Sequence, residues 1–254
     1  MKTKLSLTLT AIAVAIARAE EGGGGHYLPG ATSSFIDALP GRPGLAVVNY
    51  FTYYDASVSA SRSLPLAGLL AADLEATIYA DTVGLIYETP WRLLGGDYAA
   101  GLAVPYLWME VRGEVALPGG GTGPRRNSVN GVGDIQILPF MIGWTHGPNW
   151  KYDVRLGVYA PSGDFEAGRI ANVGKNFWTF EPGASVSWLS TKIGTEATLF
   201  AGFDVNTKNH ETDYQSGATF HLDGTVAQHL PLLGGVLGVG ANGFYYQQIS
   251  GDSG

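Results

Sequence analysis

The sequence predicts an all-β protein, an antiparallel transmembrane β-barrel of which about nine strands are present. Three observations support this prediction: long segments alternate between apolar and polar residues, their connections are alternately short and long, and the N-terminus has the pattern of an export signal. The 254 residues include 37 Gly and no Cys, and 15% are charged. The lack of Cys excludes a disulfide scaffold, a thiolate metal site and a cysteine nucleophile.

Residues 1–19 resemble a secretory signal peptide. Lys2 and Lys4 precede an apolar run from Leu5 to Ala17, and Ala17-Arg18-Ala19 fits the rule for cleavage after Ala19. The run is too short to span a bilayer, which takes about 20 apolar residues. Cleavage leaves 12 basic and 22 acidic residues, a net charge of −10, which argues against a nucleic-acid partner.

Residues 20–43 are predicted to form a flexible periplasmic N-terminal arm, and residues 44–254 the barrel. In the segment from Tyr152, apolar residues alternate with Asp153 and Arg155, and the segment from Tyr214 keeps its phase for about a dozen residues. Such lengths exceed the five or six residues usual in soluble sheets and suit membrane strands. We predict strands at residues 44–55, 72–88, 97–115, 133–145, 149–160, 177–190, 193–206, 213–229 and 235–249.

The connections between these strands alternate in length. Short turns with Gly or Pro are predicted at Thr89–Gly96, His146–Pro148, Thr191–Lys192 and Leu230–Gly234, and long loops at Ala56–Ala71, Ala116–Val132 and Pro161–Asn176. The one exception is Thr207–Thr212, which is short at a position where the alternation predicts a long loop. Short periplasmic turns and long outer loops are typical of outer-membrane barrels, whereas a soluble sandwich has no reason to collect its long loops at one end.

Two further local patterns concern the ends of the predicted barrel. Leucines at helix-like spacing in Leu64–Leu74 predict a short helix in the first long loop. Aromatic residues gather where the membrane interfaces would lie, as two girdles. Those near the short turns are Trp91, Trp144, Trp150 and Trp188, and those near the long loops are Tyr53, Tyr54, Phe177 and Trp178.

The third long loop carries a family resemblance. Pro161-Ser162-Gly163-Asp164-Phe165, Ala171-Asn172 and Asn176-Phe177-Trp178-Thr179-Phe180-Glu181-Pro182 resemble the "MetA-pathway of phenol degradation" family, and Glu21–Gly30 and Gly131–Asp134 support the match. The resemblance implies an outer-membrane barrel that passes small hydrophobic or aromatic compounds. It also implies contact with outer-membrane lipid, with lipopolysaccharide and with the outer-membrane assembly machinery.

The C-terminal end departs from the pattern of such barrels, which finish on a strand with a terminal aromatic residue. This sequence ends in Ile249-Ser250-Gly251-Asp252-Ser253-Gly254, and nine is an odd number of strands where bacterial barrels close with an even one. We therefore expect the sequence to be a fragment without its closing strands.

Two groups of residues are candidates for contact with a solute. The third long loop is the expected constriction, and the inward faces of two strands are the expected lumen lining. These residues are Asp164, Phe165, Asn172, Asn176, Phe177 and Trp178 in the loop, and Asp153, Arg155, His221 and Asp223 on the strands. The predicted function is passive transport. Two alternatives stay open: a structural or adhesive barrel that transports nothing, and a secreted β-sandwich binding protein.

The sequence offers no complete catalytic site or metal site. His221 and Asp223 share a strand face, but Ser216 lies on the opposite one and no Gly-x-Ser-x-Gly motif occurs. His210 and Glu211 supply two ligands, which is too few for a metal. We therefore predict no enzymatic activity and no cofactor.

Overall fold

The computed structural model describes residues 6–9, 24–29, 42–58, 64–117, 120–232 and 235–254, and every regular element in them is a β-strand. The described residues contain no helix that is long and apolar enough to cross a membrane. In chain order the strands are β1 (Ser6–Leu9), β2 (Gly44–Val58), β3 (Leu64–Leu66), β4 (Leu69–Leu93), β5 (Gly96–Ala116), β6 (Thr122–Val132), β7 (Ile135–His146), β8 (Trp150–Ala160), β9 (Thr179–Leu189), β10 (Thr195–Asn206), β11 (Thr219–Leu232) and β12 (Gly235–Gln248).

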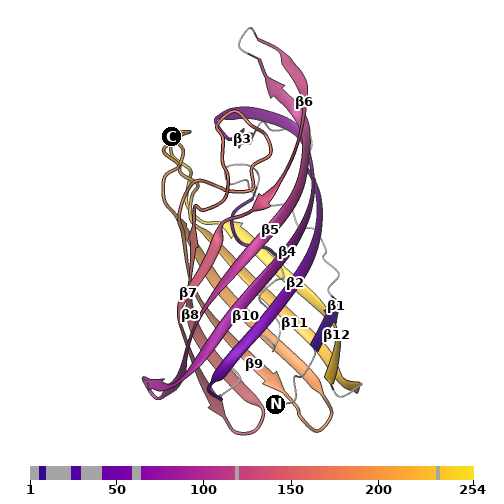
Figure 1. Ribbon diagram of the computed structural model, residues 1–254, viewed down its shortest axis with the longest axis vertical. Helices are drawn as coiled ribbons and strands as arrows, with labels where there is room; N and C mark the ends of the chain where they lie inside the picture. The colour runs from indigo at the N-terminus through magenta and orange to yellow at the C-terminus, as the bar shows by residue number, and fades with distance from the viewer. Residues whose placement is uncertain (1–5, 10–23, 30–41, 59–63, 118–119, 233–234) are drawn as a thin grey trace.

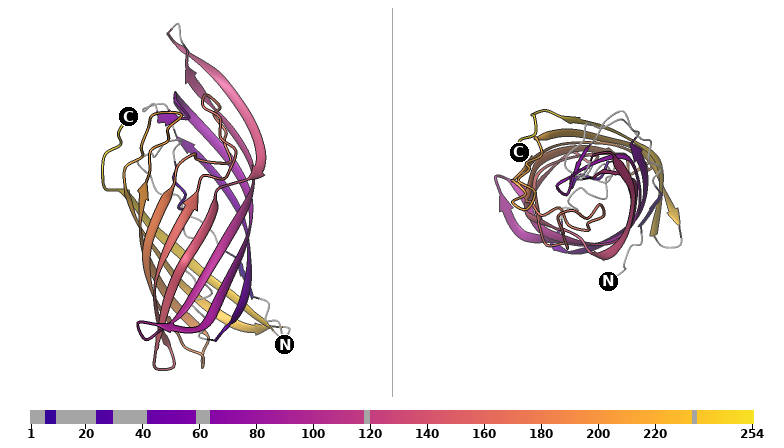
Figure 2. Two further views of the ribbon diagram at one scale, coloured as in Figure 1. Left: turned by 60° about the vertical axis from the view of Figure 1, so that its left-hand side comes forward. Right: turned by 90° about the horizontal axis from the view of Figure 1, so that it is seen from above.

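Nine of these strands form the wall of a barrel (Figure 1). They are neighbours in the order β12-β11-β10-β9-β8-β7-β5-β4-β2, and each neighbouring pair is antiparallel. Viewed along the barrel axis, the tilted strands curl into a ring (Figure 2). The predicted all-β class and the nine-stranded antiparallel wall are therefore confirmed.

The wall has two edges. β2 forms one edge, and β1 pairs in parallel with β12 at the other. Among the described residues, no pairing joins β2 to β12 or to β1. β1 lies within the predicted signal peptide, whose expected cleavage point after Ala19 falls outside the described residues. That further strands close the ring stays a prediction.

The wall is apolar on its outer face and polar on its inner face. On β8, Tyr152 and Val154 are exposed, whereas Asp153 and Arg155, which alternate with them, are buried. The same alternation on β10 exposes Leu199, Phe203 and Val205. Soluble domains bury their large apolar side chains and rarely expose wide apolar patches. The reversed distribution is that of a membrane barrel with a polar lumen, and it disfavours a soluble sandwich.

The two ends of the barrel differ, as the connection lengths predicted. β4–β5, β7–β8, β9–β10 and β11–β12 are joined at one end, which we call the short-turn end (Figure 1). At the other, the long-loop end, β4 and β5 extend beyond the ring and pair with β3 and β6. Trp91 and Trp150 are exposed near the short turns, and Tyr53 and Trp178 are exposed toward the long-loop end.

The predicted helix at Leu64–Leu74 is wrong. Ala67 and Gly68 both have positive φ, 48° and 79°, and make a two-residue turn between β3 and β4. The leucines therefore alternate along two strands, and Leu64, Leu66 and Leu74 join a small apolar cluster under the long loops. A tight turn with positive φ at both positions outweighs the helical spacing.

The predicted strand at 213–229 starts too early, because β11 begins at Thr219. Asp213 has a φ of 58°, and Tyr214 and Gln215 make isolated bridges to Asn209 and Ser253 instead of joining the wall. The connection between β10 and β11 is therefore residues 207–218, so the apparent exception in loop length disappears.

Candidate functional site

The inner face of the wall holds a cluster of charged side chains from four adjacent strands. We call it the lumen cluster; its members are Asp153 and Arg155 on β8, Glu181 on β9, Asp204 on β10, and His221 and Asp223 on β11, and each is at most 7% exposed. Every member lies at an inward position of its strand. The alternating sequence therefore places them on one inner surface.

Glycines in the wall make room for the imidazole of this cluster and for the neighbouring Phe200 ring. Gly202 lies directly opposite His221 in the β10–β11 ladder, and a Cβ there would fall 2.5 Å from the imidazole. A Cβ at Gly183 would fall 2.5 Å from the Phe200 ring. Part of the Gly excess in the composition thus serves the packing of large inward side chains.

The acidic groups of the cluster have defined partners. Arg155 Nε donates to Asp153 Oδ1 at 2.7 Å, and its guanidinium lies 5.3 Å from the centre of the Phe200 ring. Tyr159 donates its hydroxyl hydrogen to Glu181 Oε2 at 3.0 Å, and Thr219 donates to Asp204 Oδ2 at 2.9 Å. His221 Nδ1 lies 3.4 Å from Asp223 Oδ2.

The described part of the N-terminal arm lies inside the barrel (Figure 2). Tyr27 stacks on His221 with ring centres 3.8 Å apart and on Tyr246 at 5.6 Å, and its hydroxyl donates to Asp223 Oδ1 at 2.6 Å. Residues 20–43 were expected to form a flexible periplasmic arm. Residues 24–29 are placed in the lumen instead, because inward-facing rings and carboxylates there match the side chains of His26 and Tyr27.

His26 connects the arm to the third long loop. Its Nε2 lies 2.8 Å from Asp134 Oδ2, its Nδ1 lies 2.7 Å from Thr179 Oγ1, and its ring stacks on Tyr159. Burial lowers the pKa of His26 below 6.5, and the nearby Lys175 adds to this effect, while the Asp134 carboxylate opposes it. His26 is therefore held mainly in its neutral form.

Asp134 also fixes both ends of the third long loop. Its Oδ1 accepts a hydrogen bond from Gly163 N at 2.9 Å, and its Oδ2 accepts one from Lys175 N at 2.7 Å. Between these points Ile170 and Ala171 pack into the apolar cluster at the long-loop end. The loop therefore reaches from the end of β8 to the apolar side chains of β3, β4 and β5.

The predicted loop residues occupy different environments. Phe177 is buried inside, 5.3 Å from the His26 ring, whereas Trp178 is 42% exposed on the outward face that it shares with Phe180. Asp164 pairs with Arg169 at the surface, and Phe165 is half-buried. Asn172 Oδ1 accepts from Glu166 N and Arg169 Nε within the loop. Asn176 donates to Asn209 Oδ1 at 2.9 Å.

Several lumen residues were not among those predicted from the sequence. Glu181 and Asp204 stand at inward positions of β9 and β10, and this phase is the signal that could have found them. Tyr159 is drawn into the cluster by its hydrogen bond to Glu181. No alternating pattern surrounds His26 and Tyr27, so nothing in the sequence indicated that they enter the lumen.

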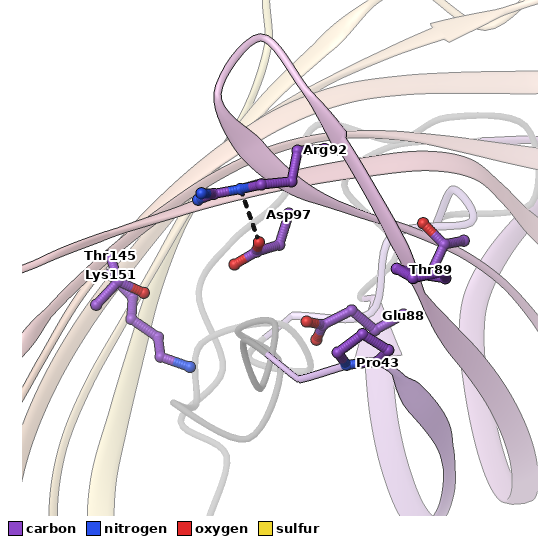
Figure 3. Close-up of a pocket in the computed structure, with 8 residues that line it drawn as sticks. Pro43, Glu88, Thr89, Arg92, Asp97, Thr145 and Lys151 are labelled. Atoms are coloured by element: carbon purple, nitrogen blue, oxygen red, sulfur yellow. Dashed lines mark ion pairs between the residues drawn. The ribbon is translucent and has the colours of Figure 1, made fainter.

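A second polar pocket, of about 590 Å³, lies at the short-turn end (Figure 3). Arg92 and Asp97, from the β4–β5 hairpin, form an ion pair at 3.3 Å. Glu88 and Lys151 point into the pocket from opposite sides. Side chains of both charge signs therefore line the pocket at this end.

The family model described as "Putative MetA-pathway of phenol degradation" matches residues 55–254. The chain is similar in fold to the crystal structure of an outer membrane channel from Pseudomonas putida F1, with a TM-score of 0.52 and 14% sequence identity, over 81% of this chain and 72% of that one. No curated protein matches the chain.

Proposed function

The chain belongs to the MetA-pathway of phenol degradation family, and on this premise we propose that it is a passive outer-membrane channel for small hydrophobic or aromatic compounds. The channel of similar fold from Pseudomonas putida supports the proposal, as does the polar inner face of the wall. In this proposal residues 1–19 are a cleaved signal peptide. The apolar outer face meets lipid, the long loops meet lipopolysaccharide, and the assembly machinery inserts the barrel.

The observation that carries the proposal is the stacking of Tyr27 inside the barrel. Its phenol ring stacks on His221 and on Tyr246, which lie opposite each other in the β11–β12 ladder, and Asp223 accepts its hydroxyl hydrogen. The same surfaces suit a free phenol, which offers the same ring and the same donor. We infer that a small aromatic solute occupies this place when the arm withdraws.

The lumen charge supports neutral or cationic solutes over anions. The lumen cluster contains four carboxylates and one guanidinium, so an entering anion meets repulsion. Passage is passive, because a solute that exchanges with Tyr27 needs no chemical step.

The test is uptake of labelled phenol by intact cells, at a concentration where the outer membrane limits entry. Deletion of the full-length protein is expected to slow uptake severalfold, and its restoration to reverse the loss. Tyr27→Ala removes both the stack and the hydrogen bond, so it is expected to raise uptake above that of the unaltered protein. Tyr245→Ala is the matched control, since Tyr245 is adjacent to Tyr246 in the sequence but is 50% exposed on the outer face.

Two outcomes would overturn the proposal. The first is equal uptake with and without the protein, which would favour a structural or adhesive barrel. The second is equal uptake by the Tyr27 and Tyr245 variants, which would separate the arm from transport.

A further inference from the structure

We propose that Glu181, Asp204 and His221 bind a divalent transition-metal ion such as Zn²⁺ inside the barrel. The three residues come from adjacent strands, β9, β10 and β11, and all three side chains are buried. Nothing in the proposed transport of aromatic compounds requires this metal, so the two proposals stand separately.

The distances fit a metal site that contracts slightly on binding. His221 Nε2 lies 3.8 Å from Asp204 Oδ2 and 3.9 Å from Glu181 Oε2, and one ligand atom from each residue lies within 4.8 Å of the others. Tetrahedral zinc with bonds of roughly 2.0–2.1 Å needs ligand atoms about 3.4 Å apart. A shift of about 0.4–0.5 Å would bring His221 Nε2 to this distance from each carboxylate.

The imidazole provides the observation that distinguishes this cluster from an ordinary acidic one. His221 has no exposed surface, and its Nε2 is a buried nitrogen without a hydrogen-bond partner, aimed at two carboxylates. Buried polar atoms nearly always have a partner, so an orphan nitrogen in this position indicates a missing ligand. A metal ion would accept its lone pair.

The surroundings hold the ligands as an outer shell does in metal sites. His221 Nδ1 faces Asp223 Oδ2 at 3.4 Å, which favours a proton on Nδ1 and a free lone pair on Nε2. Thr219 and Tyr159 each donate to the metal-facing oxygen of one carboxylate, at 2.9 and 3.0 Å. These hydrogen bonds hold in place the two carboxylate oxygens that face His221.

The negative charge of the lumen cluster also favours the binding of a cation. Four buried carboxylates face one guanidinium, and Arg155 makes its short contact with Asp153. A cation would be attracted to this excess of carboxylates. One imidazole and two carboxylates form a donor set that suits Zn²⁺ and related ions. The bound ion would also link three wall strands beneath Tyr27.

The test is calorimetric titration of the untagged, refolded, chelator-treated full chain with Zn²⁺. One ion per chain is expected to bind. His221→Gln and Asp204→Asn are each expected to weaken binding at least tenfold. His210→Gln, which removes an exposed loop imidazole, should bind as the unaltered chain does. Absence of binding to the unaltered chain, or equal binding by the His221 variant, would overturn the proposal.

A second measurement needs no variant and decides the matter if the variants fail to refold. X-ray absorption of the Zn²⁺-loaded unaltered chain is expected to show one imidazole nitrogen and otherwise oxygen ligands. A first shell with no imidazole, or with two or more, would contradict the assignment, because the chain contains other histidines but only His221 in this cluster.

Discussion

His26 is titratable and buried, and its burial makes the docking of the arm depend on pH. Burial lowers its pKa below 6.5. Lys175 lowers this pKa further, whereas the Asp134 carboxylate raises it. The third titratable neighbour is Tyr159, whose ring stacks on the imidazole. A histidine with a lowered pKa binds protons more tightly when undocked. The docked state is therefore fully favoured above about pH 6.5 and loses stability as the pH falls below it.

Acidification is accordingly expected to release the arm. In lipid bilayers, the mean conductance of the full chain should rise between pH 7.5 and pH 5. His26→Gln keeps a polar side chain without a proton to gain, so its conductance should change less over the same range. Identical pH dependence in both proteins would exclude His26 as the group responsible.

Gly202 is a residue at which even one added methyl group would clash with a neighbouring side chain. An added Cβ would lie 2.5 Å from the His221 ring, closer than real contacts allow. Overpacking of this kind typically costs about 1–3 kcal/mol. Gly202→Ala should therefore unfold at lower urea concentration, as followed by heat-modifiable gel migration. Gly224→Ala is the control, because its nearest neighbour would be 3.6 Å away; equal midpoints for the two variants would contradict the packing argument.

The conformation of the third long loop depends on one carboxylate, which lies in the connection between β6 and β7. Asp134 accepts from Gly163 N and Lys175 N and contacts His26 Nε2. Hydrogen bonds to a charged acceptor contribute about 1.5–3 kcal/mol each. Asp134→Asn replaces one acceptor by a donor, so it should free both the loop and the arm.

Limited trypsin digestion in detergent measures this release. Cleavage after Arg169 and Lys175 is expected to accelerate at least tenfold in Asp134→Asn. Asp164→Asn breaks only a surface ion pair with Arg169, which is worth about 0–1 kcal/mol, and should be cleaved nearly as slowly as the unaltered chain. Equal rates for the two variants would show that Asp134 does not hold the loop.

The wall strands were predictable because apolar and polar residues alternate with a period of two, which shows which face of a strand meets water. Asp153 and Arg155 revealed the inward face of β8, and the structure buries both. Other elements escaped because a local conformation overrides the pattern. Positive φ at Ala67 and Gly68 turns the leucine-rich segment into a hairpin, and positive φ at Asp213 delays the start of β11.

On the scale of the whole molecule, alternation says which residues face inward but not what fills the space between them. His221 and Asp223 were expected at inward positions of their strand, and the structure buries both. Their meeting with Tyr27 joins positions nearly 200 residues apart in sequence, and no local pattern carries that information. Glu181 and Asp204 could be assigned to the inner face, but their approach to His221 depends on the register of three strands.

The accessibility of spin labels tests most directly whether the wall separates lipid outside from a polar lumen inside. The natural absence of Cys permits single spin labels at Leu199→Cys and Phe203→Cys, on the outer face, and at Thr198→Cys and Ser187→Cys, on the inner face. In lipid vesicles, the outer labels are expected to collide readily with oxygen and scarcely with a water-soluble nickel complex. The inner labels should be shielded from lipid-dissolved oxygen. Outer labels as accessible to the nickel complex as those of a soluble protein would contradict the membrane barrel.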